Sequence, residues 1–159
     1  MNMFILNIAL AIIWAALWGS PTLTMLMAGY VLGFFTLWFA SPVFGMRRSY
    51  FLRSWRVVRL ILYFLYELVM SSVRVAYDVL TPNDYSTPAI LEMPLDVKTD
   101  FQILLITNLI SLTPGTLSLD VSSDRKTLTF HAMYADNPEA LISEMKNGME
   151  RMVREVFEE

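Results

Sequence analysis

The sequence predicts a membrane protein in two parts. The first is a transmembrane α-helical hairpin plus an amphipathic helix, and the second is a small cytoplasmic α+β domain of order β-α-β-β-α. Three features predict this class. Residues 1–46 contain no charged side chain. Five arginines follow within thirteen residues, and residues 47–80 carry a net charge of +4. Residues 81–159 are acidic, with thirteen acidic against six basic side chains.

The composition limits the chemistry that the chain can perform. It is 55% hydrophobic and 17% charged, and it contains no cysteine and a single histidine, His131. Disulfides and thiolate metal sites are therefore excluded. An acidic C-terminal half is a poor match to phosphate groups, so we expect no nucleic-acid partner. We expect no metal, no cofactor and no catalytic residue, because no phosphate loop, dinucleotide fingerprint or zinc-protease motif occurs.

The first 46 residues predict a transmembrane hairpin. Two apolar runs, residues 3–18 and 23–40, are separated only by Gly19-Ser20-Pro21-Thr22. Each run is near the lower limit for a spanning helix, since about 20 residues cross the hydrocarbon core. The alternative is a hairpin in the core of a soluble protein. It is disfavoured because the remaining chain is too small to wrap two uncharged helices.

The arginines that follow the hairpin predict its orientation. Short basic segments are retained on the cytoplasmic side of a membrane, which places the N-terminus of the hairpin there as well. The cluster is a marker of topology and of the membrane interface, and it consists of Arg47, Arg48, Arg53, Arg56 and Arg59. Gly29 and Gly33 form a Gly-x-x-x-Gly pair, which permits close helix contact in lipid and favours packing against a partner.

Residues 51–80 predict one long helix with a polar stripe. The stripe recurs at helical spacing and consists of Arg56, Tyr63, Glu67, Ser71, Arg74 and Asp78. Such a helix lies in the cytoplasmic interface of the membrane or crosses it as a third span with its stripe against a neighbour. Glu67 and Arg74 are accordingly candidate intramembrane or interface charges. Glu67 is a cation or proton relay in one interpretation and an ordinary surface contact in the other.

The remainder divides into a linker, residues 81–88, and a small acidic domain, residues 89–159. Alternating residues and turn signals predict this domain as a strand around residues 91–97, a helix over 101–112, strands over 116–121 and 127–132, and a last helix from Pro138. Pro94 predicts that the first strand lies at a sheet edge. The last helix has an apolar stripe opposite a polar face of Glu144, Lys146, Glu150, Arg151 and Arg154.

The end of the helix over 101–112 carries the most distinctive stretch of the chain. It reads Asn108-Leu109-Ile110-Ser111-Leu112-Thr113-Pro114-Gly115-Thr116-Leu117. One interpretation is an ion site built from exposed helix-end carbonyls. The other is a helix stop, because proline lacks a donor and glycine adopts the left-handed cap.

This stretch resembles the E subunits of the multisubunit Na+/H+ antiporters of the Mrp, Mnh or Pha type. The resemblance extends over the whole chain, and the matching residues are Asn108, Ser111, Thr113, Pro114, Gly115 and Thr116. It implies a plasma-membrane hetero-oligomer that exchanges Na+ or another monovalent cation for protons. Within it, this chain would be a small accessory subunit with a cytoplasmic C-terminal domain. No catalytic residue is implied, because the matching motif has no ionisable side chain.

We therefore expect an accessory subunit that assembles and stabilises a cation/proton antiporter, with hydrophobic partner subunits and the lipid bilayer as its surroundings. A membrane-tethered module that recruits a soluble partner to the inner membrane is the alternative. A membrane-bound enzyme is the third possibility, and it lacks a polar cluster to support it.

Overall fold

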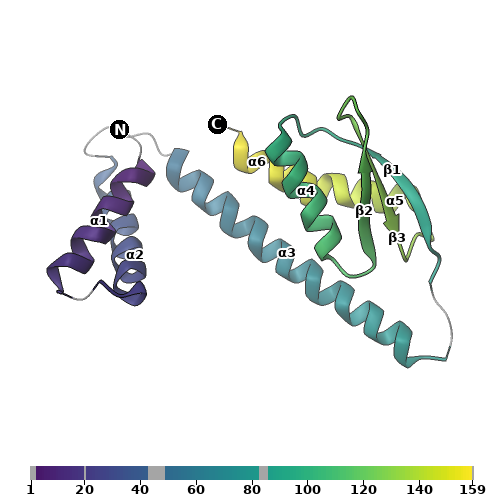
Figure 1. Ribbon diagram of the computed structural model, residues 1–159, viewed down its shortest axis with the longest axis horizontal. Coiled ribbons are helices and arrows are strands. Elements are labelled where there is room, and N and C mark those ends of the chain that lie inside the picture. Colours follow the sequence, from purple (N-terminus) through teal and green to yellow (C-terminus); the bar gives the residue numbers. More distant parts are fainter. Residues whose placement is uncertain (1–2, 20, 43–48, 83–85, 159) are drawn as a thin grey trace. The chain divides into compact units, whose positions relative to one another are not determined.

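The computed structural model describes residues 3–19, 21–42, 49–82 and 86–158 (Figure 1). Its elements are α1 (Met3–Leu17), α2 (Leu23–Ala40), α3 (Ser49–Leu80), β1 (Ala89–Pro94), α4 (Asp100–Leu112), β2 (Thr116–Val121), β3 (Thr127–Ala132), α5 (Pro138–Met145), the π-helix η1 (Lys146–Glu150) and α6 (Arg151–Phe157). The chain divides into two compact units, Met1–Ser54 and Trp55–Glu159.

Two helices of the described chain, α2 and α3, are long and apolar enough to cross a membrane by length and composition. The third apolar segment at the N-terminus, α1, has only 15 residues. At 1.5 Å per residue α1 is about 22 Å long and α3 about 48 Å, against a hydrocarbon core of about 30 Å. Helix α1 is therefore shorter than the hydrocarbon core, and α3 is longer than it.

In the first unit, α1 and α2 pack through their smallest side chains. The buried residues of α1 recur every four positions and are Met3, Asn7, Ala11 and Ala15. A Cβ atom added at Gly29 would lie 2.8 Å from the Cβ of Trp14 and 3.0 Å from the Cα of Ala11. At Gly33 it would collide with the side chain of Asn7. The close helix contact expected of the Gly-x-x-x-Gly pair is therefore made with α1 of the same chain.

A small polar cluster ties the start of α3 to this hairpin. The Asn7 amide, fully buried, donates a hydrogen bond to the Tyr50 hydroxyl at 3.1 Å. The Tyr30 and Tyr50 hydroxyls are hydrogen-bonded at 3.0 Å. The ring of Phe34 packs on Tyr50 and Phe51. Each of the first three helices thus contributes one polar side chain to this cluster.

The second unit contains an antiparallel sheet in the order β1-β3-β2. Strand β1 lies at an edge, as Pro94 predicted, because proline cannot donate to a ladder. One face of the sheet packs on the helices, and the fully buried side chains of this core include Met93, Ile106, Ile110, Leu128, Phe130 and Val153. The order β-α-β-β-α predicted from the sequence is confirmed.

Local hydrogen bonds explain where the elements of this unit begin and turn. Thr99 and Gln102 form a reciprocal capping box at the start of α4. In the β2–β3 turn, the Asp124 carboxylate accepts hydrogen bonds from the Ser122 hydroxyl at 2.7 Å and from the Lys126 backbone N–H at 3.2 Å. These two hydrogen bonds lower the pKa of Asp124 below its ordinary value, because they favour the charged form.

The last helix corrects one expectation. Glu150 was expected on the solvent-facing side, yet it is 1% exposed. The reason is η1, since a π-turn inserts extra backbone and rotates the residues that follow relative to a 3.6-residue pattern. The Glu150 carboxylate turns inward and accepts the backbone N–H groups of Asp96 at 2.6 Å and Val97 at 3.2 Å. It therefore holds the connection between β1 and α4.

Candidate functional site: the interface between α3 and the acidic domain

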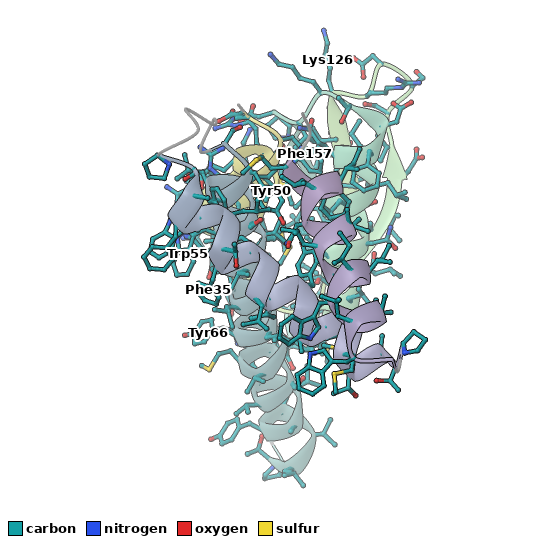
Figure 2. All side chains as sticks on the ribbon, turned by 90° about the vertical axis from the view of Figure 1, so that its left-hand side faces the viewer. Phe35, Tyr50, Trp55, Tyr66, Lys126 and Phe157 are labelled. Atoms are coloured by element: carbon teal, nitrogen blue, oxygen red, sulfur yellow. The ribbon has the colours of Figure 1, made fainter. Side chains whose placement is uncertain are left out.

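The most informative feature of the second unit is the orientation of α3, from Trp55 to Leu80. Its polar stripe faces the domain, and most of its large apolar side chains are exposed on the opposite side. Figure 2 shows Trp55 and Tyr66 projecting from the same side of this helix. The outer face of α3 is exposed and consists of Trp55, Val58, Ile61, Leu62, Leu65, Tyr66, Val69 and Val73. A helix in water has the opposite arrangement.

The first contact of α3 with the domain is made by arginines of the basic cluster. One guanidinium nitrogen of Arg56 donates to the backbone carbonyls of Glu155 at 2.7 Å and Glu158 at 2.6 Å. Arg59 forms an ion pair with the Glu155 carboxylate at 3.5 Å. The last carbonyls of a helix lack intrahelical donors and carry partial negative charge. Arg56 therefore caps the C-terminus of α6.

The middle of the interface is apolar. Leu60 is buried, and Tyr63 and Phe64 pack against the same core as the sheet and α4. The Tyr63 ring lies over Gly148 of η1, where an added Cβ would collide with the tyrosine hydroxyl. Any larger side chain at residue 148 would push α3 away.

The last contact links α3 to the end of β3. The Tyr134 hydroxyl donates to the Asp78 carboxylate at 3.2 Å, and the Arg74 guanidinium lies 5.9 Å from the centre of the Tyr134 ring. An edge of that ring lies against Gly115, whose φ is +90° and whose added Cβ would be 3.5 Å from it. Gly115 thus combines a left-handed turn with the place where Tyr134 packs.

The motif from Asn108 to Thr116 forms the connection between α4 and β2. The Thr116 hydroxyl donates to the Ile110 carbonyl at 2.6 Å, and the Thr113 hydroxyl donates to the Leu109 carbonyl at 3.0 Å. The Asn108 amide donates to the Leu104 carbonyl at 2.7 Å. The Ser111 hydroxyl accepts the backbone N–H of Ser118 at 3.0 Å.

These hydrogen bonds decide between the two interpretations of the motif. The carbonyls of Leu109, Ile110 and Thr113 accept hydrogen bonds from hydroxyl groups of the motif itself. The geometry therefore supports the helix stop, and it adds a function that spacing alone did not reveal. The motif fastens β2 to α4 and provides the floor on which Tyr134 and α3 rest.

Two adjoining cavities lie beneath α3. The first, of about 100 Å³, is lined by Tyr63, Glu67, Ser71 and the motif residues Thr113–Thr116 among others. The second, of about 470 Å³, is lined by Asp78, Asp136 and Asn137 among others. Arg74, Tyr134, Leu141 and Glu144 line both. The interface therefore brings Glu67 and Arg74, predicted as a pair of charges, into the same neighbourhood as the motif.

The structure places the other predicted residues as follows. Arg47 and Arg48 lie outside the described residues. Arg53 is exposed on the first turns of α3. The sequence did not single out Tyr134 or Gly148, although both contact α3. A lone glycine on the predicted last helix is the one signal that could have revealed Gly148, because glycine lowers helix stability unless something packs closely against it.

Apolar helices, an outward-facing apolar side of α3 and a compact acidic domain define a membrane-associated protein of mixed α and β structure. A comparison of the whole chain with known families gives the particular assignment. Residues 7–156 match the MNHE family, described as Na+/H+ ion antiporter subunit. The chain belongs to this family, and the resemblance inferred from the motif is confirmed.

Individual relatives agree with this assignment. The E1 subunit of the Na(+)/H(+) antiporter of Staphylococcus haemolyticus is 37% identical over 98% of this chain and 97% of its own length. The E subunit of the Na(+)/H(+) antiporter of Alkalihalophilus pseudofirmus is 38% identical over 96% of each chain. A chain of the archaeal membrane-bound sulfane sulfur reductase, a respiratory membrane complex, has the same fold with a TM-score of 0.56 at 24% identity. The match covers 99% of this chain and 100% of that chain.

Proposed function

We propose that this chain is an accessory subunit of a multisubunit monovalent cation/proton antiporter, which assembles and stabilises the complex within the membrane. Its family and its near full-length relatives are antiporter subunits. It is a component of a transporter rather than an enzyme. The alternative of a tethered module that recruits a soluble partner is not favoured, because the relatives named above are antiporter subunits.

The orientation of α3 is the observation that carries the structural part of the proposal. Its polar stripe is occupied by the acidic domain, so the outer face must meet an apolar phase. A helix with one strongly apolar face lies in the membrane interface, with that face about 5–10 Å below the headgroups. A helix about 48 Å long is also too long to cross upright. Both arguments favour the interfacial arrangement over a third span.

With α3 at the cytoplasmic surface, the rest of the topology follows. The hairpin of residues 1–46 spans the bilayer, residues 81–88 link α3 to the domain, and the domain of residues 89–159 remains in the cytoplasm. Arg47, Arg48 and Arg53 then lie where anionic headgroups and the positive-inside rule place them. The site consists of contacts that hold the domain against α3, and it contains no group assigned to ion transport.

Single-cysteine labelling tests the topology, since the natural chain has no cysteine. In the assembled complex, a spin label at Val69→Cys on the outer face should be accessible to oxygen, which concentrates in lipid. The matched label at Ile90→Cys, an exposed residue of the sheet, should be accessible to a water-soluble nickel reagent. Equal exposure of both sites to the nickel reagent would exclude the interfacial helix.

The accessory role needs a separate experiment. Deleting the gene should abolish Na+ tolerance of the host cells, and the purified chain alone in liposomes should exchange no cations for protons. The complete purified complex in the same liposomes is the control and should be active. Robust exchange by the isolated chain would overturn the accessory role.

A further inference from the structure

Helix α4 has an exposed apolar side that the contacts described above do not use. Phe101, Leu104 and Leu112 recur at helical spacing and are 61%, 58% and 60% exposed. We call these three residues the α4 stripe. The buried apolar side chains of α4 lie on its other side and are Ile103, Ile106 and Ile110. Residues 101–119 contain no charged side chain, although the domain as a whole is acidic.

Helix α4 runs alongside α3 within the second unit (Figure 1). At the start of α4, the Phe101 ring packs edge-on against Phe157 of α6, with 5.6 Å between the ring centres. This is the end of α6 that Arg56 of α3 caps. At the end of α4, Ile110 lines a cavity together with Ser71 of α3. The two helices therefore run in the same direction, and α3 is close to both ends of α4.

The exposed apolar surfaces of the two helices adjoin. Phe64 of α3 and Leu105 and Leu109 of α4 are half-buried and pack against the same core. Around α3, Phe64 lies between the buried Leu60 and the exposed Ile61, because successive residues are separated by 100°. The two leucines lie in the same way between the core side of α4 and its stripe. The apolar outer face of α3 therefore continues across this junction onto the α4 stripe.

The polar side chains beside the α4 stripe have hydrogen-bond partners within the chain. The Thr107 hydroxyl and the Asn108 amide each donate to the backbone carbonyl four residues earlier, at 2.9 Å and 2.7 Å. The Ser111 hydroxyl accepts the backbone N–H of Ser118 at 3.0 Å. Such bonds lower the cost of placing a polar side chain in an apolar phase, because a polar group without a partner is costly there. The surface is thus suited to surroundings that offer no hydrogen bonds.

These observations select lipid as the occupant. A protein interface normally positions its partner with hydrogen bonds and a polar rim. The α4 stripe lies in an uncharged stretch whose polar side chains bond to the chain itself. This step rests on the proposed function, which places the outer face of α3 in the cytoplasmic membrane interface. We propose that the α4 stripe enters the same interface, so that α3 and α4 together form a two-helix lipid-binding surface.

Site-specific photocrosslinking identifies the occupant. Leu104 is replaced by the photoreactive residue p-benzoylphenylalanine in the intact complex in native membrane vesicles. Irradiation should join residue 104 to phospholipid, which mass spectrometry detects. The same replacement of Ile90, an exposed residue of the sheet, is the matched control and should give no lipid product. A product that joins residue 104 to another subunit, or to a second copy of this chain, would overturn the proposal, because it would identify a protein as the occupant.

Spin labelling of the assembled complex measures insertion independently. The ratio of oxygen to nickel-reagent accessibility at Leu104→Cys should match that at Val69→Cys and exceed that at Ile90→Cys. Adding Leu112→Glu should lower the ratio at residue 104 toward the Ile90→Cys value, because a carboxylate in the stripe opposes insertion. Leu119→Glu, the same change at an exposed leucine of β2, is the matched control and should leave the ratio unchanged. An unchanged ratio in both glutamate variants would contradict insertion through the stripe.

The two levels of the proposal fail differently. If Val69→Cys and Leu104→Cys are both as accessible to the nickel reagent as Ile90→Cys, the interfacial α3 of the proposed function is wrong. If Val69→Cys lies in lipid while Leu104→Cys behaves like Ile90→Cys, only the assignment of the α4 stripe is wrong. Unchanged thermal unfolding of the labelled variants shows that the domain is intact in either case.

Discussion

The buried side chains of the two units differ in size and polarity. In the first unit most buried residues are small or polar, such as Asn7, Ala11, Gly29 and Gly33, and the large buried ones form a single cluster of Met3, Leu37 and Phe51. Many other large apolar side chains of this unit are exposed. In the second unit the buried residues are large and apolar, such as Phe130. Packing through small residues is effective in lipid, whereas burial of large ones is effective in water. The contrast therefore indicates which solvent each unit was selected for.

The long helix α3 combines both patterns in one element. From Trp55 onward it presents Leu60 and its polar stripe to the second unit and keeps its outer face apolar, as the hairpin does. It is thus organised for water on one side and hydrocarbon on the other. We therefore expect truncation of a large side chain to be most damaging in the second unit and enlargement of a small one to be most damaging in the first.

The largest effect is expected in the core of the second unit. Phe130 is fully buried in the central strand, and Phe130→Ala should lower the free energy of unfolding by about 3–5 kcal/mol. Urea denaturation of the detergent-solubilised chain, followed by circular dichroism, measures this loss. Leu117→Ala on the exposed face of the sheet is the control and should lose less than about 1 kcal/mol. Similar losses at both sites would show that this core is not closed in the way described.

In the hairpin the damaging change is an enlargement rather than a truncation. Gly33→Leu would force a side chain into Asn7 and separate α1 from α2, with an expected loss of about 1–3 kcal/mol. Thermal unfolding in detergent micelles measures it. Ala28→Leu, on the exposed side of the same helix, should be neutral. If Gly33→Leu were equally neutral, the small-residue packing of the hairpin would be wrong.

A smaller effect is expected at the contact between α3 and the C-terminus of α6. Arg56→Ala removes the cap on the carbonyls of α6 and should lower stability by about 1–2 kcal/mol, with partial recovery in Arg56→Lys. Chemical denaturation measures this difference. Arg151→Ala, which removes an exposed pair four residues apart, is the control and should lose no more than about 0.5 kcal/mol. Equal losses would show that Arg56 acts only as surface charge.

The smallest effect is a pH dependence of the β2–β3 turn. The pKa of Asp124 is lowered in the folded chain, so its contribution is present above its ordinary value of 3.8 and is lost as pH falls below it. Hydrogen exchange at the amides of Lys126 and Thr127 should therefore be slower in the wild type than in Asp124→Asn near neutral pH. The difference should vanish in acid. A difference that persisted well below pH 3.8 would contradict this assignment.

Much of this architecture could be predicted because periodicity reports which residues share a face. The polar stripe of α3, the edge position of β1 and the order of the second unit all follow from spacing and from proline chemistry. Spacing does not report what a face contacts. Arg56 was interpreted as a topology marker, and its contact with α6 depends on residues about a hundred positions away.

Two further differences have a local cause. The π-turn of η1 breaks the 3.6-residue rule on which the exposure of Glu150 was predicted, and a single sequence carries no periodic signal for it. The Gly-x-x-x-Gly pair was predicted correctly as a close-contact site, but the pattern cannot distinguish a neighbouring chain from the preceding helix. In both cases the missing information is tertiary.

The hydrogen bonds from Arg56 to the carbonyls of Glu155 and Glu158 have a consequence for biosynthesis. The ribosome produces α3 long before it produces the residues that occupy its inward side, since the acceptors of Arg56 follow it by 99 and 102 positions. Until those residues emerge, the Arg56 guanidinium lacks these acceptors and lies on a helix with an exposed apolar face. This state favours adsorption of α3 to a membrane before the domain has folded. A truncation before Glu155 would leave Arg56 without these two carbonyl acceptors for the lifetime of the molecule.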